Sequence, residues 1–326
     1  MTSSLLIAFA LCLSFFVAAT VGASSVSVSM APAIGSNSVG VLRGALLVGI
    51  FGFIGSVAQG ARVTTGVSDR IVEGTISFEI GLVSLLVIGT CIGLGILAEH
   101  SIPAAFSTVG SVAGAGIAAG RAPNLDYWWL TFASWIATGV IAAVLAFGFL
   151  VVIRHLSEFF EGSTAFEALA IAGLDEVILT AGVVFSFVGG GSQVGLAIGP
   201  LVGVVDSVGI GLGPLLVFGG LGILAGSWVK SPVMLNAVGR QYASFGPETS
   251  LAVLLTAIIL VQIVANVLGV PISYNHVIIS SIIGCSLISS ERETDARKLA
   301  GTLVSWIATV IGSFLAAYGL YFVFVL

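Results

Sequence analysis

The pentapeptide Ser134-Trp-Ile-Ala-Thr138 recurs unchanged as Ser305-Trp-Ile-Ala-Thr309, 171 residues further along the chain. Three more pairs of segments keep the same order at nearly the same spacing. They are Gly22-Ala-Ser-Ser-Val26 with Gly190-Gly-Ser-Gln-Val194, Gly44-Ala-Leu-Leu-Val48 with Gly213-Pro-Leu-Leu-Val217, and Ser111-Val-Ala-Gly114 with Ser281-Ile-Ile-Gly284, at offsets of 168, 169 and 170 residues. Chance could produce one such match in an apolar chain, but not an ordered set. The sequence is therefore a duplication.

The composition indicates that the solvent of this chain is a lipid bilayer. Only 8% of its 326 residues are charged, 58% are hydrophobic, and the mean hydropathy is +1.19. Roughly a quarter of the residues of an average soluble domain are charged, so this chain could not provide a soluble surface. We expect an all-α, multi-pass protein of the cell (plasma) membrane. The chain has no basic tract, which argues against a nucleic-acid partner.

Hydrophobic runs of about 20 residues predict spanning helices, and ten segments stand out. They cover residues 5–21, 39–61, 76–98, 102–119 and 128–153 in the first half, and 169–188, 210–229, 251–270, 272–288 and 299–326 in the second. We therefore divide the chain into an N-terminal membrane repeat (1–153), a polar linker (154–167) and a C-terminal membrane repeat (168–326). Residues 1–22 lack the positively charged start of a secretory signal, so we expect a retained first span.

Two interrupted segments occupy matching places in the two halves. Residues 22–35 read GASSVSVSMAPAIG and residues 189–200 read GGGSQVGLAIGP. Duplicated halves with interrupted helices, especially inverted repeats, are typical of secondary transporters, whose binding site lies where the interruptions meet. About five segments per half, an odd number, would invert one repeat relative to the other. The alternative is that these small residues only allow close helix packing.

The interrupted segments carry groups that suit an oxyanion. A helix that unwinds inside the membrane frees N–H groups, which must find a partner, and a glycine-rich helix start is a good seat for an anion. Ser24, Ser25 and Ser192 could add hydroxyl donors. The three cysteines, Cys12, Cys91 and Cys285, all lie in apolar runs, which argues against a disulfide framework or a metal cluster.

A second polar intrusion, Pro271-Ile-Ser-Tyr-Asn-His276, lies between two apolar segments. Ionisable residues at such depth are costly and usually functional, and His276 could donate to an anion or take up a coupling proton. The alternative is a histidine that bonds a backbone carbonyl or lies at the headgroup level. The corresponding residues 101–106 carry no such polar set, so we expect an asymmetric site.

These motifs resemble those of the inorganic phosphate transporter (PiT) family, which also includes sulfate permeases. That family carries a duplicated signature close to G-A-N-D-V-A-N, and a P-V-S-T-T-H segment before an I-I-G-x-G-L helix. Here Gly22-Ala-Ser-Ser-Val26 takes the place of the first signature, residues 187–200 that of the second, and Pro271-Ile-Ser-Tyr-Asn-His276, followed by Ile282-Ile-Gly284, that of the P-V-S-T-T-H segment. The resemblance runs over nearly the whole chain and implies the fold of that family, with broken or re-entrant helices.

The chain departs from the family at the Asn-Asp of the signature, which is Ser24-Ser25 in the first copy and Ser192-Gln193 in the second. In the family these amide and acidic groups are implicated in binding a coupling cation and the anion. A hard cation prefers oxygen ligands and usually negative charge, so the loss of both carboxylates weakens the argument for sodium. Na⁺ and H⁺ both remain open as the coupling ion, and no other cofactor is expected.

Together these features predict a secondary active transporter, not an enzyme, that moves an inorganic oxyanion by alternating access in symport with a cation. The resemblance favours phosphate, and sulfate or another oxyanion is the alternative. Besides backbone N–H groups, the residues expected to bind the anion or to complete and gate its pocket are Ser24, Ser25, Ser192, Gln193, Ser273, Asn275 and His276.

Two readings from other classes remain open. The first is a transport-inactive membrane sensor or partner subunit, which the altered signature would suit. The second is an intramembrane hydrolase built on Ser192 and His276, which would require the two side chains to lie within hydrogen-bond reach. The sequence also leaves open whether the chain forms a homodimer.

Overall fold

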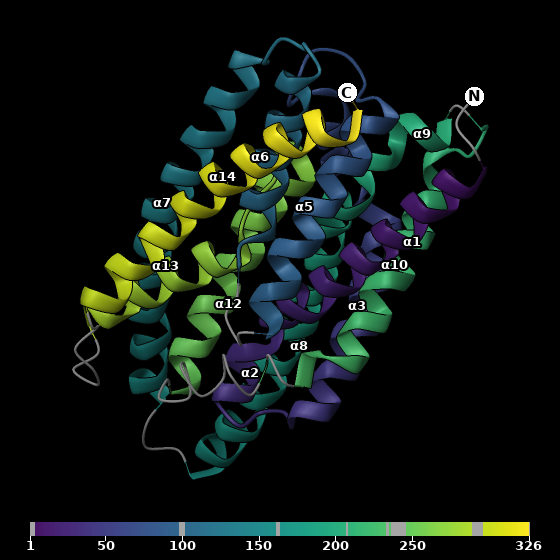
Figure 1. Ribbon diagram of the computed structural model, residues 1–326. Coiled ribbons are helices and arrows are strands. Elements are labelled where there is room, and N and C mark those ends of the chain that lie inside the picture. Colours follow the sequence, from purple (N-terminus) through teal and green to yellow (C-terminus); the bar gives the residue numbers. More distant parts are fainter. Residues whose placement is uncertain are drawn as a thin grey trace.

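A computed structural model describes residues 4–97, 102–160, 164–206, 208–232, 235, 246–288 and 296–325 of the chain (Figure 1). In the first half, a long segmented helix is followed by a spanning helix, a short helix and three more helices. Their bounds are α1 Ser4–Val21, the π-helical turn η1 Gly22–Val26, the 3₁₀ turn η2 Ser27–Met30, α2 Ala31–Gly35, α3 Val41–Gln59, α4 Ala61–Asp69, α5 Phe78–Leu97, α6 Ala104–Ala118 and α7 Leu125–Phe160.

The described part of the second half repeats this order except for the short helix α4, whose counterpart falls largely outside the described residues. Its elements are α8 Thr164–Ile198, the 3₁₀ turn η3 Gly199–Leu201, α9 Val202–Asp206, α10 Leu212–Val229, α12 Pro247–Val261, the π-helical turn η4 Gln262–Val267, α13 Tyr274–Ser286 and α14 Ala296–Val325. Every one of the ten predicted hydrophobic segments contains a helix. The described residues hold eight helices long and apolar enough to cross a membrane. They include one isolated β-bridge, Val72 with Pro123, and no strand. The all-α membrane fold is confirmed.

Corresponding helices of the two halves run in opposite directions. In Figure 1, α1 descends from the N-terminus at the upper right, whereas α8 begins at the bottom and leads to α9 near the top. Likewise α7 descends at the left, whereas α14 rises to the C-terminus. The predicted inversion of the repeats is therefore visible in the structure.

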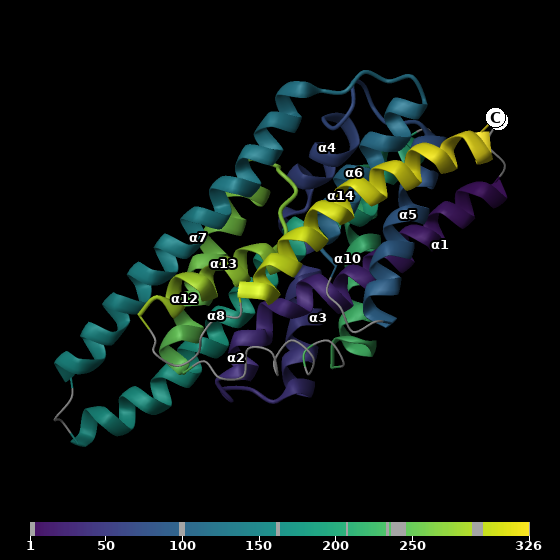
Figure 2. The ribbon, with the colours of Figure 1, turned by 60° about the vertical axis from the view of Figure 1, so that its left-hand side comes forward.

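The two repeats are interlocked, because helices of one pack on helices of the other. α3 contacts α8 and α1 contacts α10, while α6 contacts α14 and α13 contacts α7. Figure 2 shows α14 and α7 as long outer helices on the face that also carries α6 and α13. Each contact has a counterpart in the other repeat, so the duplication in sequence is also a duplication of packing.

Close helix contacts explain why a glycine recurs at matching positions of the two repeats. A methyl group at Gly114, on α6, would overlap the Phe314 carbonyl of α14, and one at Gly284, on α13, would overlap the Ala143 carbonyl of α7. These glycines end the matched Ser-x-x-Gly segments. Small residues let membrane helices approach backbone to backbone, so this sequence match records equivalent contacts.

The polar stretch 154–167 differs from an extended linker. α7 continues to Phe160 and α8 begins at Thr164, so both ends of the stretch are helical. Residues 161–163 lie outside the described residues. The division of the chain into two units at this stretch stays a prediction.

Candidate functional site

The interruptions predicted in the two halves are present, but they take different forms. In the first half, α1 passes into the π-helical turn Gly22–Val26 and then into the 3₁₀ turn Ser27–Met30. In the second half, α8 continues through Gly189–Gly191 as a regular helix to Ile198 and tightens only at Gly199–Leu201. The expectation that the second glycine run unwinds and frees its N–H groups is therefore wrong.

Packing explains why the glycines of α8 stay helical. A methyl group at Gly190 would overlap the Gly52 carbonyl of α3, and one at Gly55 would overlap the Phe187 carbonyl of α8. The glycines thus serve a close crossing of two helices. Where water is excluded, a backbone keeps its own hydrogen bonds unless another partner replaces them.

Side chains supply the polar groups at this crossing. The Ser192 and Tyr274 hydroxyls lie 2.7 Å apart and share a hydrogen bond, and Ser192 Oγ lies 3.3 Å from the Gly189 carbonyl. Gln193 Nε2 donates to the Ile272 carbonyl at 3.1 Å and to Ser192 Oγ at 3.3 Å. The structure therefore brings Ser192 and Gln193 together with the segment that contains Ser273.

The segment at the start of α13 is buried. Ser273 caps the helix, since its Oγ accepts a hydrogen bond from the His276 N–H at 3.4 Å. Asn275 and His276 are each 8% exposed, and Asn275 takes part in a further interaction. The His276 ring meets the Trp306 ring at 4.9 Å between centroids, while its Nδ1 has no hydrogen-bond partner among the described residues. The alternative that this histidine bonds a backbone carbonyl finds no support at Nδ1.

The two serines of the first half lie in the π-helical turn. Ser24 Oγ donates to the Thr20 carbonyl of its own helix at 2.8 Å. Ser25 is 4% exposed. The turn η1 contacts α8 and α13, but no hydrogen bond joins Ser24 or Ser25 to Ser192 or Gln193 there. Local π-helical turns are frequent at functional sites.

Trp135 and Trp306, the tryptophans of the repeated pentapeptide, both contact the segment 271–276. Trp135 Nε1 donates to the Pro271 carbonyl at 2.7 Å, and its ring lies 4.1 Å from that of Phe106. Trp306 packs against His276. In the helix register of the repeats, Phe106 is the third residue of α6 and His276 the third of α13. The two halves therefore differ at this position, as expected: the first has the phenyl ring of Phe106 and the second has the imidazole of His276.

Sequence reasoning missed two residues here, Tyr274 and Asn266. Tyr274 is 1% exposed, stacks on Phe185 at 4.9 Å and bonds Ser192. Asn266 lies in the π-helical turn η4 and bonds Gln59, Gln262 and the Val188 carbonyl. Tyr274 stood inside the polar motif and could have been chosen. Asn266 gave little signal, because one amide near the end of an apolar run is also typical of a headgroup-level residue.

Ser192 does not form a catalytic pair with His276, because its hydroxyl is engaged by Tyr274. Within the part of the chain that the structure describes, the hydrogen bonds of Ser192, Gln193 and Tyr274 run to hydroxyls, an amide and backbone carbonyls. Among the described residues no group of three or more His, Cys, Asp or Glu could hold a metal ion. The centre of the site is therefore uncharged.

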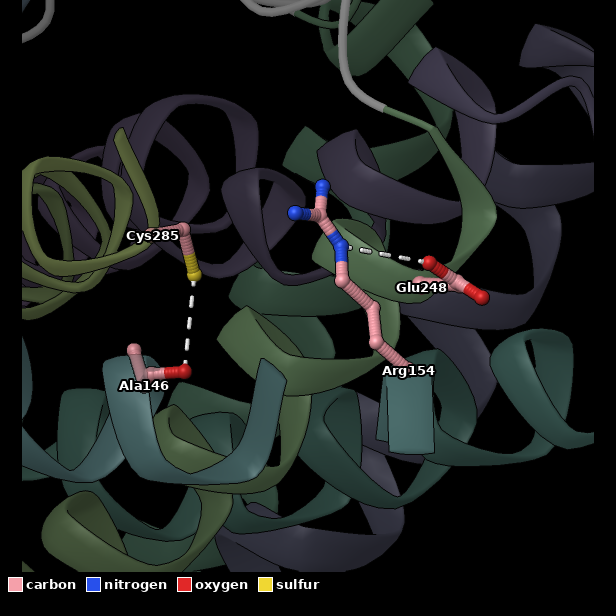
Figure 3. A network of polar contacts seen from close by, with 4 residues as sticks. All are labelled: Ala146, Arg154, Glu248 and Cys285. Carbon is pink, nitrogen blue, oxygen red and sulfur yellow. Dashed lines mark hydrogen bonds and ion pairs between the residues drawn. The ribbon is translucent and has the colours of Figure 1, made fainter. Parts of the chain in front are cut away.

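An ion pair lies apart from this site and joins the two repeats. Arg154 Nε on α7 lies 3.5 Å from Glu248 Oε2 on α12, and both side chains are about one-third exposed (Figure 3). Nearby, Cys285 Sγ on α13 donates to the Ala146 carbonyl of α7 at 3.6 Å. These contacts fasten α7 to α12 and α13.

Inverted repeats of spanning helices, each of which opens on a segmented helix that ends in a short helix, α2 or α9, are typical of membrane transporters. The chain belongs to the phosphate transporter family, whose model matches residues 21–172 and again 164–317. It is therefore a multi-pass membrane protein of the cell membrane that transports an anion, and not an enzyme.

Several known proteins are similar to this chain. A putative phosphate permease of Helicobacter pylori is 22% identical over 92% of this chain and 72% of its own length. The sulfate permease CysP of Bacillus subtilis is 28% identical over 95% of this chain and 85% of its own length. A solved structure described as the sodium-dependent phosphate transporter superposes with a TM-score of 0.88, at 20% identity, over 98% of this chain and 99% of that one. That structure shares the fold.

Proposed function

We propose that the protein is a secondary active transporter that moves an inorganic oxyanion, phosphate in the first place, by alternating access. The observation that carries the proposal is the cluster of neutral donors at the α8 crossing, namely Ser192, Gln193 and Tyr274. Burying an anion is costly unless it is hydrogen-bonded. Hydroxyl and amide groups that satisfy one another in the empty site can turn to an anion when it enters.

Burial supports the alternating-access part of the proposal. Each of the seven predicted binding residues is at most 8% exposed, so an anion could reach them only if helices separate. The inverted repeats supply two related halves that can rock against each other around a central site. Ser25 lies on the first half, and Ser192 and Gln193 lie on the second.

Sulfate is the second candidate substrate. A sulfate permease is among the relatives that match almost the whole chain. A site without charged side chains also suits either tetrahedral anion, since both accept hydrogen bonds from hydroxyl and amide donors.

The test is uptake of labelled phosphate and sulfate by the purified protein in liposomes, together with thermal stabilisation by each anion. The double variant Ser25→Ala/Gln193→Ala should lose most uptake and most anion-dependent stabilisation, because two donors are removed. Thr90→Ala is the matched control, since Thr90 is exposed on α5 and bonds only its own helix at Leu86. Normal uptake by the double variant would refute the site. Anion binding by the wild type without uptake would instead favour a sensor.

A further inference from the structure

A small cavity lies between Tyr274 of the proposed anion site and the Arg154–Glu248 ion pair. Its walls come from α2, α12 and α13, and they include Pro32 on α2 and Ser250 on α12. The cavity has room for about one water molecule. An anion of the size of phosphate or sulfate therefore cannot pass through it as it stands.

The course of α13 places this cavity between the anion site and the ion pair. Tyr274 is the first residue of α13. Ile278 and Ile282, which line the cavity, follow about one and two helical turns later. Cys285, less than one turn further, lies near the ion pair (Figure 3). The cavity thus lies on a line that leads from the anion site to the end of the bundle where the ion pair is exposed.

Ser250 brings a hydroxyl without a partner to this cavity. The residue is 2% exposed, and its Oγ has no hydrogen-bond partner among the described residues. Such buried hydroxyls are rare and call for a water or a ligand. Most other wall residues, such as Val253 and Ile278, are apolar. A narrow apolar constriction is closed to ions, because it holds too little water to hydrate them.

The ion pair supplies a positive charge at the outer end of the cavity. Glu248 directly precedes Thr249 and Ser250, two of the wall residues. Arg154 meets Glu248 through Nε, and Figure 3 shows its two terminal nitrogens turned away from that carboxylate. Guanidinium nitrogens suit an oxyanion, which they can bind with two parallel hydrogen bonds. Because both side chains are about one-third exposed, the pair is weak, and an approaching anion can compete with Glu248.

We propose that this cavity is the closed form of a passage for the oxyanion. The passage joins the anion site to the end of the bundle at Arg154, whose charge attracts the anion to its mouth. When α12 and α13 separate from α2, the passage widens and takes up water, and Ser250 donates to the anion on its way. This inference rests on the proposed function and adds the route of the anion and the residue that guides it.

The first test is the reactivity of Ser250→Cys in liposomes toward a small, negatively charged methanethiosulfonate reagent. The wild type gives the baseline for the three native cysteines. During uptake the reagent should modify the variant and block transport, because the passage opens in each cycle. Thr256→Cys is the matched control, since Thr256 is also buried on α12 but does not line the cavity. A reaction of Ser250→Cys no faster than that of this control would overturn the passage.

The second test uses the opposite charges of the ion pair. Arg154→Gln and Glu248→Gln both break the pair, so a purely structural role predicts the same change in both. A guiding role predicts opposite changes, because one variant removes the positive charge and the other unmasks it. At low ionic strength, the half-saturating anion concentration for uptake should rise about threefold in Arg154→Gln and fall about threefold in Glu248→Gln, and high salt should shrink both differences. Changes in the same direction, or none, would remove Arg154 from the route.

These outcomes separate the inference from the proposed function. A wild type that takes up an oxyanion, together with an unreactive Ser250→Cys, would overturn the passage and leave the transporter proposal standing. Failure of the wild type to take up phosphate or sulfate would overturn the proposed function, and the passage with it.

Discussion

Ser192, which we propose binds the anion, already has hydrogen-bond partners when no anion is bound. Its hydroxyl bonds Tyr274 and lies against the Gly189 carbonyl, so nothing polar at this point is left unsatisfied without a ligand. The same hydroxyls remain neutral donors that an anion could recruit. The sequence predicted Ser192 from its place in the repeat, but its tyrosine partner lies 82 residues away, and contacts of that range follow only from the folded chain.

Tyr274→Phe should weaken anion binding while leaving the fold intact. The substitution removes the hydroxyl that meets Ser192 but keeps the ring that stacks on Phe185. A hydrogen bond of this kind contributes about 1 kcal/mol net, so we expect a small loss of thermal stability and a fivefold or greater loss of anion affinity. Calorimetric titration with phosphate measures the affinity. An unchanged affinity would remove Tyr274 from the site.

At the scale of the element, the irregular turns distinguish this bundle from a set of straight helices. The turns η1 and η4 are π-helical and contain Ser24, Ser25 and Asn266, and both contact α8. The glycine run of α8, in contrast, remains helical because it crosses α3 closely. A glycine-rich segment is compatible with either a break or a close crossing, so the sequence could not distinguish them.

Gly190→Ala should be severely destabilising, whereas Gly148→Ala should not. An added methyl at Gly190 would overlap the Gly52 carbonyl, which is backbone and cannot move without separating α3 from α8. At Gly148 on α7 no atom lies within 4 Å of the added methyl, and alanine favours a helix over glycine by roughly 1 kcal/mol. Thermal unfolding in detergent compares the two variants. Equal stability of both would contradict the close crossing.

At the scale of the whole molecule, the inverted repeats are related but not identical. The phenyl ring of Phe106 in one half stands where the other half has His276, and an ion pair joins α7 to α12 through Arg154 and Glu248. In the first repeat, the counterpart of Glu248 is Glu79 on α5. In the second repeat, the counterpart of Arg154 is Val325, by the offset of 171 residues that relates Trp135 to Trp306. The same ion pair therefore cannot form on the other side of the pseudo-symmetric bundle.

The ion pair should contribute little to stability. Its groups are 34% and 31% exposed, and such partly exposed pairs are worth about 1 kcal/mol or less. A double-mutant cycle with Arg154→Ala and Glu248→Ala should give a coupling energy in that range, and it should fall further at high salt. The cycle is read from thermal or denaturant unfolding. A coupling of several kcal/mol would instead make the pair a principal lock between the repeats.

The sequence by itself determined the membrane class, the duplication and the placement of ten helical segments. Low charge and long apolar runs leave only the bilayer as solvent, and local hydrophobicity marks each span along the chain. Only the tertiary structure decided that the α8 glycines form a crossing, that Ser192 meets Tyr274 and not His276, and that Gln59, Gln262 and Asn266 converge. These facts depend on contacts between residues remote in sequence, and hydrophobic patterning carries no information on which polar side chains will face each other inside a bundle.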